Sequence, residues 1–326
     1  MKAVWYDRNG PAAEVLTCGE LPTPSPGPGE VLVRLATSGV NPSDWKTRLG
    51  RTRPKAFPRI VPHSDGAGTV EAVGEGVDRA RIGERVWIWN GQWKRPFGTA
   101  AEYIALPAAQ AVRLPEGTGL AEGACLGIPA LTALHAVLTD GGVTGRRVLV
   151  TGGAGSVGHY AIQFARLLGA AQVLATVSGP EKAAHAAAAG ADATINYRQE
   201  SVPERVAALT GGAGVDRVVE VDVSGNAPLL PAVLAPGGIC AAYGANEATA
   251  TVEFGAAILH GIALRFFIVY ELTPAQRATA IGALTPWLER GLLRHTVAAR
   301  LPLAECVRAH EEVEAGRHIG NLVLEC

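Results

Sequence analysis

Hydrophobic and polar residues follow two different periods along this chain of 326 residues. Before about residue 111, short β-branched and apolar runs are separated by turns rich in Gly and Pro, which predicts the strands of a small barrel or sandwich. From about residue 147 onward, short apolar runs alternate with stretches whose apolar residues recur at helical spacing, which predicts a parallel βαβ sheet. In the first part, strands are expected at 2–6, 30–35, 68–73, 85–89 and 101–106.

The second part is predicted to be a doubly wound sheet, because its strands and helices have the lengths and order of that fold. Strands are expected at 147–151, 172–177, 193–196, 216–221 and 238–243, with helices at 157–168, 180–189, 201–209 and near 229–234. The connecting region between about 114 and 139 has helical spacing. A helix from Thr273 to a C-cap near Gly291, a helix at 303–314 and a strand at 320–324 form a return segment that packs on the first part.

A glycine-rich loop follows the first strand of the parallel sheet. Gly153, Gly155 and Gly158 satisfy GxGxxG between a strand and a helix, which is the context that a dinucleotide-binding loop requires. The glycines allow a tight turn, close approach of the backbone to a pyrophosphate, and packing of helix against strand. The helix N-terminus then carries the phosphates. The predicted pyrophosphate site is Gly153, Ala154, Gly155, Ser156, Val157 and Gly158.

The end of the second parallel strand decides which dinucleotide is preferred. An NAD site usually has Asp or Glu there to hold the ribose 2′-hydroxyl, whereas this chain has Ser178 and, on the next helix, Lys182. Tyr197 and Arg198 arrive after the third strand, and Glu181 is the one residue that argues against a phosphate. We therefore predict NADPH, with Ser178, Lys182 and Tyr197 at the 2′-phosphate; the alternative is that Lys182 is simply an exposed helix residue.

Composition and charge exclude several classes of protein. The net charge is −1, without a basic stripe, so a nucleic-acid partner is not expected. The five cysteines are scattered and include no CxxC pair, which argues against a disulfide framework or a structural zinc knuckle. The N-terminus lacks the apolar core of a signal peptide, and no run of 18 apolar residues occurs. We expect a cytoplasmic protein without a membrane partner.

Several longer segments together resemble the medium-chain dehydrogenase/reductase superfamily, in its zinc-independent NADPH:quinone oxidoreductase (zeta-crystallin-like) branch. They include GEVLVRLATSGVNPSDWKTRLG, PHSDGAGTVEAVGEGV, ACLGIPALTALHAV, VLVTGGAGSVGHYAIQFARLLGA, GADATINYR and GRHIGNLVLE. The resemblance implies an α/β fold with a GroES-like β-barrel catalytic domain at residues 1–123, completed by 268–326. A Rossmann NADPH-binding domain, with a doubly wound parallel sheet, is expected at residues 124–267.

The resemblance also implies roles for individual residues. Asn41 matches a family residue that lines the nicotinamide pocket, and Asp44 matches one that orders the same loop. Thr132 matches a residue near the nicotinamide, and Gly244 borders the cofactor. Purely structural roles stay open for these residues. Asn41 precedes a proline and is a normal turn residue, and the Thr132 hydroxyl can form a hydrogen bond within its own helix.

One departure from the family concerns the substrate. The family often has NPVDTYIRSG, whereas Trp45 and Lys46 stand here at the positions after the Asp. This removes a phenol that would contact the acceptor, and Lys46 becomes a candidate catalytic residue in its place. Trp87, Trp89 and Trp93 are candidates for a flat apolar pocket, although barrel packing explains the alternation equally well.

No metal is expected. The positions that hold a zinc-binding His-Glu pair in alcohol dehydrogenase-like relatives look like Ser64 and Asp65, and His63 is a lone histidine without partners at ligand spacing. Without a Lewis acid, reduction of an activated acceptor is more plausible than alcohol oxidation.

The expected function is NADPH-dependent reduction of a quinone or a related conjugated carbonyl. Alternatives are a 2-alkenal or enoyl reductase, and a low-turnover NADPH-binding protein of the crystallin kind. Residues 264–270, LRFFIVY, form either a buried strand or the edge of a homodimer, and the resemblance favours the homodimer.

Overall fold

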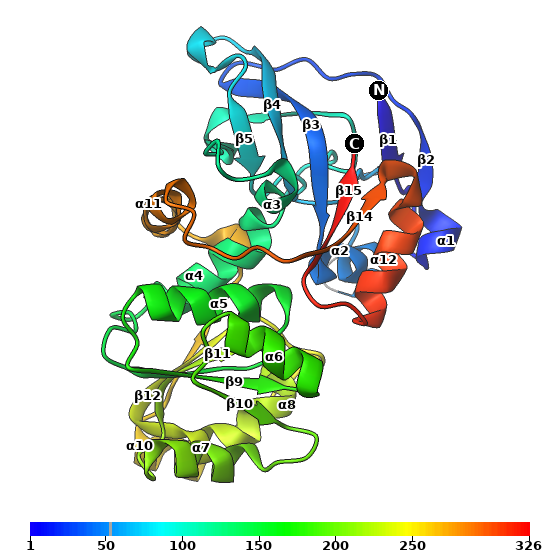
Figure 1. Ribbon diagram of the computed structural model, residues 1–326. Coiled ribbons are helices and arrows are strands. Elements are labelled where there is room, and N and C mark those ends of the chain that lie inside the picture. The colour runs from blue at the N-terminus through cyan, green and yellow to red at the C-terminus, as the bar shows by residue number, and fades with distance from the viewer. Residues whose placement is uncertain (52–53) are drawn as a thin grey trace. The chain divides into compact units, whose positions relative to one another are not determined.

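A computed structural model describes residues 1–51 and 54–326. The chain forms two compact units (Figure 1). Unit 1 consists of Met1–Ile128 and Thr285–Cys326, and unit 2 consists of Pro129–Leu284. The domain boundaries after residues 123 and 267 stay predictions.

Unit 1 is built on a seven-stranded sheet in which most neighbours are antiparallel. Its path is β14 (Val297–Pro302), β15 (Asn321–Glu325), β3 (Glu30–Val40), β4 (Asp65–Val73), β5 (Arg85–Ile88) and β7 (Ala111–Arg113), with β6 (Tyr103–Pro107) paired to β3. Alternate residues of β3 point into the core, among them Val31, Val33 and Leu35. A separate pair is formed by β1 (Lys2–Trp5) and β2 (Thr17–Glu20).

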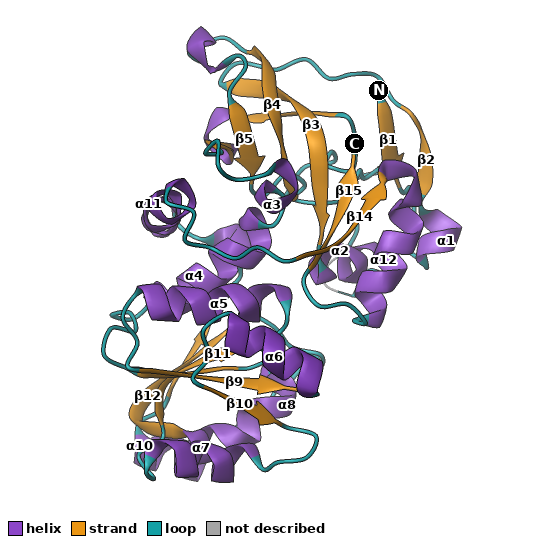
Figure 2. Ribbon diagram, viewed as in Figure 1, coloured by secondary structure: helices purple, strands orange, loops and turns teal. Residues whose placement is uncertain are grey.

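Helices from both ends of unit 1's sequence pack beside this sheet. Figure 2 shows α12 (Cys306–Ala315) beside α2 (Pro42–Arg48), and α12 also contacts α1 (Ala12–Val15). The buried face of α12 repeats at helical spacing, with Cys306, Ala309, His310 and Val313. The return segment predicted at the C-terminus therefore packs within the first unit.

Unit 2 is a six-stranded parallel sheet with helices on both faces (Figure 1). The strand order is β10 (Ala193–Asn196), β9 (Gln172–Val177), β8 (Arg147–Val150), β11 (Val215–Glu220), β12 (Leu234–Ala242) and β13 (Ala263–Phe266). One face carries α4 (Leu131–Leu138), α5 (Ser156–Leu167) and α6 (Pro180–Ala188). The other carries α7 (Val202–Thr210), α8 (Val223–Asn226), α9 (Leu230–Val233) and α10 (Phe254–His260).

The elements that the hydrophobic pattern missed are short or lack its period. They are α1, α2, α8, α10, β2, β7 and β14, while β13 overlaps residues 264–270, for which a strand was one of the two interpretations. The region 114–139 is less regular than predicted: α3 (Leu120–Gly123) is followed by a π-helical turn at Leu126–Ala130 and then by α4. Pro129 lies inside that turn and lacks the N–H that a regular helix needs. Finally, α11 (Pro274–Glu289) begins one residue after the predicted Thr273.

Candidate active site

The glycine-rich loop connects β8 to α5, and two of its glycines have no room for a side chain. A Cβ on Gly158 would lie 2.3 Å from the carbonyl oxygen of Gly152, and a Cβ on Gly153 would lie 2.7 Å from the Cβ of Ala175. Gly155 is the N-cap residue of α5, a helix of 12 residues whose first N–H groups have no partner within the helix. The predicted loop thus has the geometry of an anion site at a helix N-terminus.

A cavity of about 590 Å³ lies at the carboxyl ends of the unit 2 strands. Thr151, Gly152, Thr176, Tyr197 and Glu220 are among the residues that line it. Because β9 and β11 lie on opposite sides of β8, the strand order reverses here, which is where ligands bind in doubly wound sheets. The cavity thus lies at the end of the sheet where the glycine-rich loop begins, at Gly152, while the six residues of the predicted pyrophosphate site lie outside its lining.

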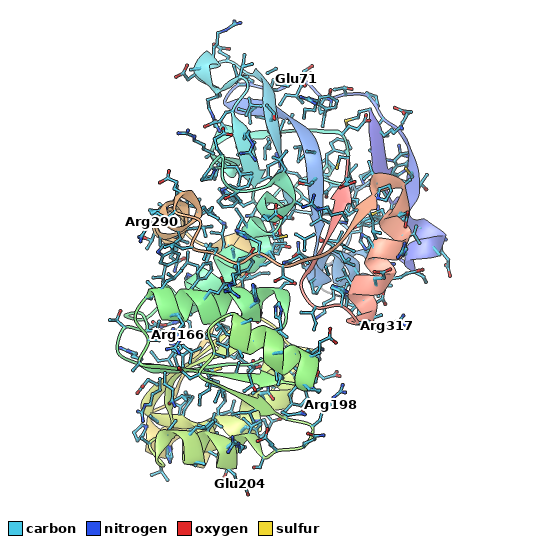
Figure 3. All side chains as sticks on the ribbon, viewed as in Figure 1. Glu71, Arg166, Arg198, Glu204, Arg290 and Arg317 are labelled. Atoms are coloured by element: carbon cyan, nitrogen blue, oxygen red, sulfur yellow. The ribbon has the colours of Figure 1, made fainter. Side chains whose placement is uncertain are left out.

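The residues predicted at the 2′-phosphate lie at one edge of this sheet. Asn196 pairs with Val177, and the backbone N–H of Tyr197 donates to the Val177 carbonyl oxygen at 3.1 Å, so Ser178 and Tyr197 follow neighbouring strand ends. Tyr197 is 52% exposed and lines the cavity, whereas Ser178 and Lys182 are half-buried residues outside its lining. Arg198, labelled in Figure 3, is exposed beside Tyr197.

Two carboxyl groups at the end of β11, on Glu220 and Asp222, were missed by the sequence analysis. Glu220 is fully buried and accepts hydrogen bonds from Thr151 Oγ1 (3.0 Å), the Asp222 N–H (2.6 Å) and Asn226 Nδ2 (2.9 Å). Burial raises the pKa of Glu220. Burial also acts to raise the pKa of Asp222, but hydrogen bonds from Ser224 and Asn246 lower it overall. Their place at the end of a predicted strand was the available signal.

Gly244 and Thr132 occupy different surroundings in unit 2. A Cβ on Gly244 would lie 2.2 Å from the Val221 carbonyl oxygen, and the Gly244 carbonyl oxygen accepts the Val223 N–H at 3.0 Å. Gly244 therefore lets the loop after β12 run against the loop after β11. Thr132 is buried on α4, with 4% of its surface exposed. Their roles toward a cofactor stay predictions.

In unit 1, Asn41 and Asp44 form the start of α2. Asn41 is the N-cap residue, and its backbone N–H donates to Asp44 Oδ2 at 2.7 Å. This contact is part of a capping box between Asn41 and Asp44, which fixes the entry of the chain into the helix. The side-chain amide of Asn41 donates to Asp65 Oδ2 at 2.9 Å. Asp44 thus contacts the loop at Asn41, and the roles of both residues toward a substrate stay predictions.

Lys46 and the tryptophans of unit 1 lie in different surroundings. Lys46 Nζ lies 5.7 Å from the ring centroid of Trp45, within range of a cation–π contact. Trp93 lines a cavity of about 230 Å³ in unit 1 with Lys55 and Lys94. Trp87 is fully buried on β5, where it serves barrel packing.

His63 has partners that sequence spacing did not reveal. His63 Nε2 lies 3.0 Å from His310 Nε2. One ring nitrogen of each histidine and Cys306 Sγ lie within 4.8 Å of one another. All three residues are buried. The interpretation of His63 as a lone histidine was therefore wrong, because both partners come from the C-terminal segment.

The hydrogen bonds around this cluster determine which nitrogens carry protons. Arg48 Nε donates to His310 Nδ1 at 3.4 Å, so the His310 proton is on Nε2 and points to His63 Nε2. His63 Nδ1 then donates to Ser38 Oγ at 2.8 Å. Burial lowers the pKa of His63 to about 3 and that of His310 well below its usual value, so both rings are neutral. A metal ion bound to these atoms would have to replace the proton on His310 Nε2, so a bound metal and the hydrogen bond between the two rings exclude each other.

Two protein families match the chain. The Alcohol dehydrogenase GroES-like domain matches residues 27–116, and the Zinc-binding dehydrogenase family matches residues 156–285. A quinone oxidoreductase of Pseudomonas aeruginosa is 33% identical over 316 residues, which are 95% of each chain. The chain belongs to the quinone oxidoreductase family of the medium-chain dehydrogenases/reductases. The predicted family, fold class and enzyme class are confirmed.

A further relative and a solved structure are also similar to this chain. A 2-haloacrylate reductase of a Burkholderia species is 32% identical over 337 residues, covering 99% of this chain and 98% of the relative. The solved structure of an Escherichia coli quinone oxidoreductase complexed with NADPH is 26% identical, covers 100% of both chains and superposes with a TM-score of 0.89. In the part of the chain that the structure describes, no helix has the length and apolarity to span a membrane.

Proposed function

We propose that this protein is a zinc-independent, NADPH-dependent reductase of quinones or related conjugated carbonyls. The observation that carries the proposal is the cavity at the sheet's switch point, which lies beside the glycine loop. The relative of known structure that binds NADPH supports this choice of cofactor.

The residues of unit 2 fit NADPH in three places. The backbone of Gly153–Gly158 and the start of α5 would hold the pyrophosphate. Ser178, Lys182 and Tyr197 would surround the 2′-phosphate. Strand β9 ends without a carboxylate, and Glu181, in the first turn of α6, is the acidic residue nearest in sequence to Lys182. Thr132 and Gly244 would lie toward the nicotinamide.

The residues of unit 1 would act on the acceptor. When bound, NADPH supplies a hydride. Asn41 would orient the reacting groups, Asp44 would order the Asn41 loop, and Lys46 would stand where relatives carry a tyrosine. Ser64 and Asp65 occupy the positions of a zinc-binding pair, and Asp65 Oδ2 already accepts two N–H groups. The reduced acceptor takes its proton from water or from a nearby donor, and the protein contributes orientation and exclusion of water.

Mixing the purified protein with NADPH and either a benzoquinone or an enone tests this proposal. We expect the absorbance of the reduced nicotinamide to fall with time. If it stays constant with both classes of acceptor, the proposal fails. Tight NADPH binding without turnover would then support the alternative of a low-turnover binding protein.

A second candidate is reduction of a conjugated carbon–carbon double bond, as in a 2-alkenal or enoyl reductase. The similarity to a 2-haloacrylate reductase over nearly the whole chain favours it. Comparing kcat/KM for a benzoquinone, a 2-alkenal and 2-chloroacrylate under the same conditions separates the candidates.

We also propose a homodimer in the cytoplasm. Large apolar side chains on α10 and at the sheet edge of unit 2 are exposed, including Leu259 (85%) and Phe266 (61%). Edge strand β13 could pair with that of a second copy. Analytical ultracentrifugation should show a dimer for the wild type and a monomer for Phe266→Glu. The five cysteines are free, as expected in a reducing compartment.

A further inference from the structure

Asp65 is a fully buried carboxyl group that holds the side chain of Asn41. It is the first residue of β4, and none of its surface is exposed. Its Oδ2 atom accepts two hydrogen bonds of 2.9 Å, one from Asn41 Nδ2 and one from the backbone N–H of Ile128. Asn41 is thus held at two points, since its own backbone N–H donates to Asp44.

The other carboxyl oxygen of Asp65 has no partner among the residues that the structure describes. Asp65 Oδ1 lies against the backbone of Gly127, where an added Cβ would come within 2.2 Å of it and within 2.7 Å of the Ile88 carbonyl oxygen. An ionised carboxylate would leave a charged oxygen unsolvated at this point. The arrangement therefore suits the neutral acid, with its proton on Oδ1, and burial raises the pKa of Asp65 in the same direction.

The backbone around Asp65 is anchored independently of its carboxyl group. The Asp65 carbonyl oxygen accepts a 2.5 Å hydrogen bond from Thr99 Oγ1, and Thr99 Oγ1 lies 2.9 Å from Ser38 Oγ. Asp65 also pairs with Gly39 across the β3–β4 register. These contacts fix the strand end. The hydrogen-bond acceptor of the Asn41 amide, Asp65 Oδ2, is therefore held in one position.

We propose that Asp65 is a positioning residue, which holds the Asn41 amide in its working orientation as a neutral acid and acts on the reaction only through Asn41. This inference rests on the proposed function, in which Asn41 orients the reacting groups. It assigns Asp65 a task different from that of a zinc-binding carboxylate.

Two substitutions of Asp65 should separate the effect of its hydrogen-bond-accepting oxygen from the effect of its charge. Asp65→Asn keeps an oxygen that can accept both N–H groups and is neutral, so kcat/KM and its pH profile should stay within a few-fold of wild type. Asp65→Ala leaves two buried donors unpaired. It should lower kcat/KM by about tenfold or more, because a misplaced orienting group is costly to catalysis. Leu106→Ala, in the barrel core of unit 1, is the matched control that loses stability without touching Asn41.

A double-mutant cycle with Asn41→Ala then tests whether Asp65 acts through Asn41. We expect Asp65→Ala to cause little further loss in kcat/KM once Asn41 has been removed. Additive losses would overturn the proposal, and so would an Asp65→Asn enzyme that is as impaired as Asp65→Ala. A merely structural role would make Asp65→Ala and Leu106→Ala equivalent in activity, measured well below their unfolding temperatures.

A readout without turnover keeps this test separate from the proposed function. In protein labelled with ¹⁵N-asparagine, the side-chain amide signals of Asn41 are assigned by their loss in Asn41→Ala. They should move strongly in Asp65→Ala and little in Asp65→Asn or Leu106→Ala. If the wild type reduces no acceptor but these shifts appear, the proposed function fails while Asp65 still positions Asn41. Unmoved signals in Asp65→Ala would refute the positioning role itself.

Discussion

His63 and His310 are 247 residues apart in the chain, yet their Nε2 atoms share a 3.0 Å hydrogen bond inside unit 1. One ring donates and the other accepts, and both outer nitrogens have partners of their own, Ser38 and Arg48. The pair is satisfied only when both rings are neutral. This requirement links the stability of unit 1 to pH.

We predict that acid destabilises the protein through these two histidines. Their pKa values lie below the unfolded value of about 6.5, with His63 at about 3. Below pH 6.5 the unfolded chain gains protons that the folded chain does not bind. The free energy of unfolding should therefore fall by up to about 1.4 kcal/mol per pH unit for each ring, and above pH 6.5 this dependence should disappear.

Urea unfolding between pH 5 and 8 checks this prediction, with a His63→Asn, His310→Gln double variant for comparison. The variant should lose less stability on acidification than the wild type. Buried histidines elsewhere titrate equally in both proteins and cancel. Parallel curves for the two proteins would contradict the prediction.

The backbone conformation of His63 leads to a second prediction. Its φ of 75° lies in the left-handed region, which asparagine tolerates and β-branched residues do not. His63→Val should therefore be less stable than His63→Asn by about 1–3 kcal/mol. Denaturant midpoints measured at pH 8 separate this strain from histidine titration. Equal stabilities would show that the backbone relaxes freely.

Gly158→Ala should damage the cofactor loop. A Cβ there would lie 2.3 Å from the Gly152 carbonyl oxygen, a backbone atom that cannot move without opening the loop. We expect NADPH affinity, measured by fluorescence titration, to fall by at least about tenfold, and the melting temperature to drop. Gly255→Ala on α10 is the control, since a Cβ at Gly255 meets no described atom within 4 Å. Wild-type affinity in Gly158→Ala would exclude this loop as the phosphate site.

Removing the cation at Lys182 should change cofactor preference. Lys182→Gln is expected to lower kcat/KM for NADPH by about tenfold, the value of one charge-assisted hydrogen bond, and to leave that for NADH nearly unchanged. Ser178→Ala should act in the same direction with a smaller effect. Initial rates with each cofactor provide the measurement, and Lys2→Gln is a distant control. A parallel loss with both cofactors would place Lys182 away from the 2′-phosphate.

The sequence was sufficient wherever function depends on contiguous residues. Gly153, Gly155 and Gly158 could be assigned to a strand–loop–helix because the steric and hydrogen-bonding demands of that turn are local. The parallel strands could be located for a similar reason, since each is a continuous apolar run. Elements such as α2 and β14 were missed because neither is a continuous apolar run: α2 is mostly polar, and most residues of β14 are not buried.

The amino-acid sequence by itself thus determined the two-part α/β fold, the glycine-rich loop before α5 and the family. Only the tertiary structure decided that His63 meets His310 and Cys306, and that Asp65 holds Asn41. No local pattern encodes these pairs, because each partner is brought into place by the folding of distant strands and helices. Burial then removes water from around them, and that loss of solvent makes two histidines and one carboxyl group neutral.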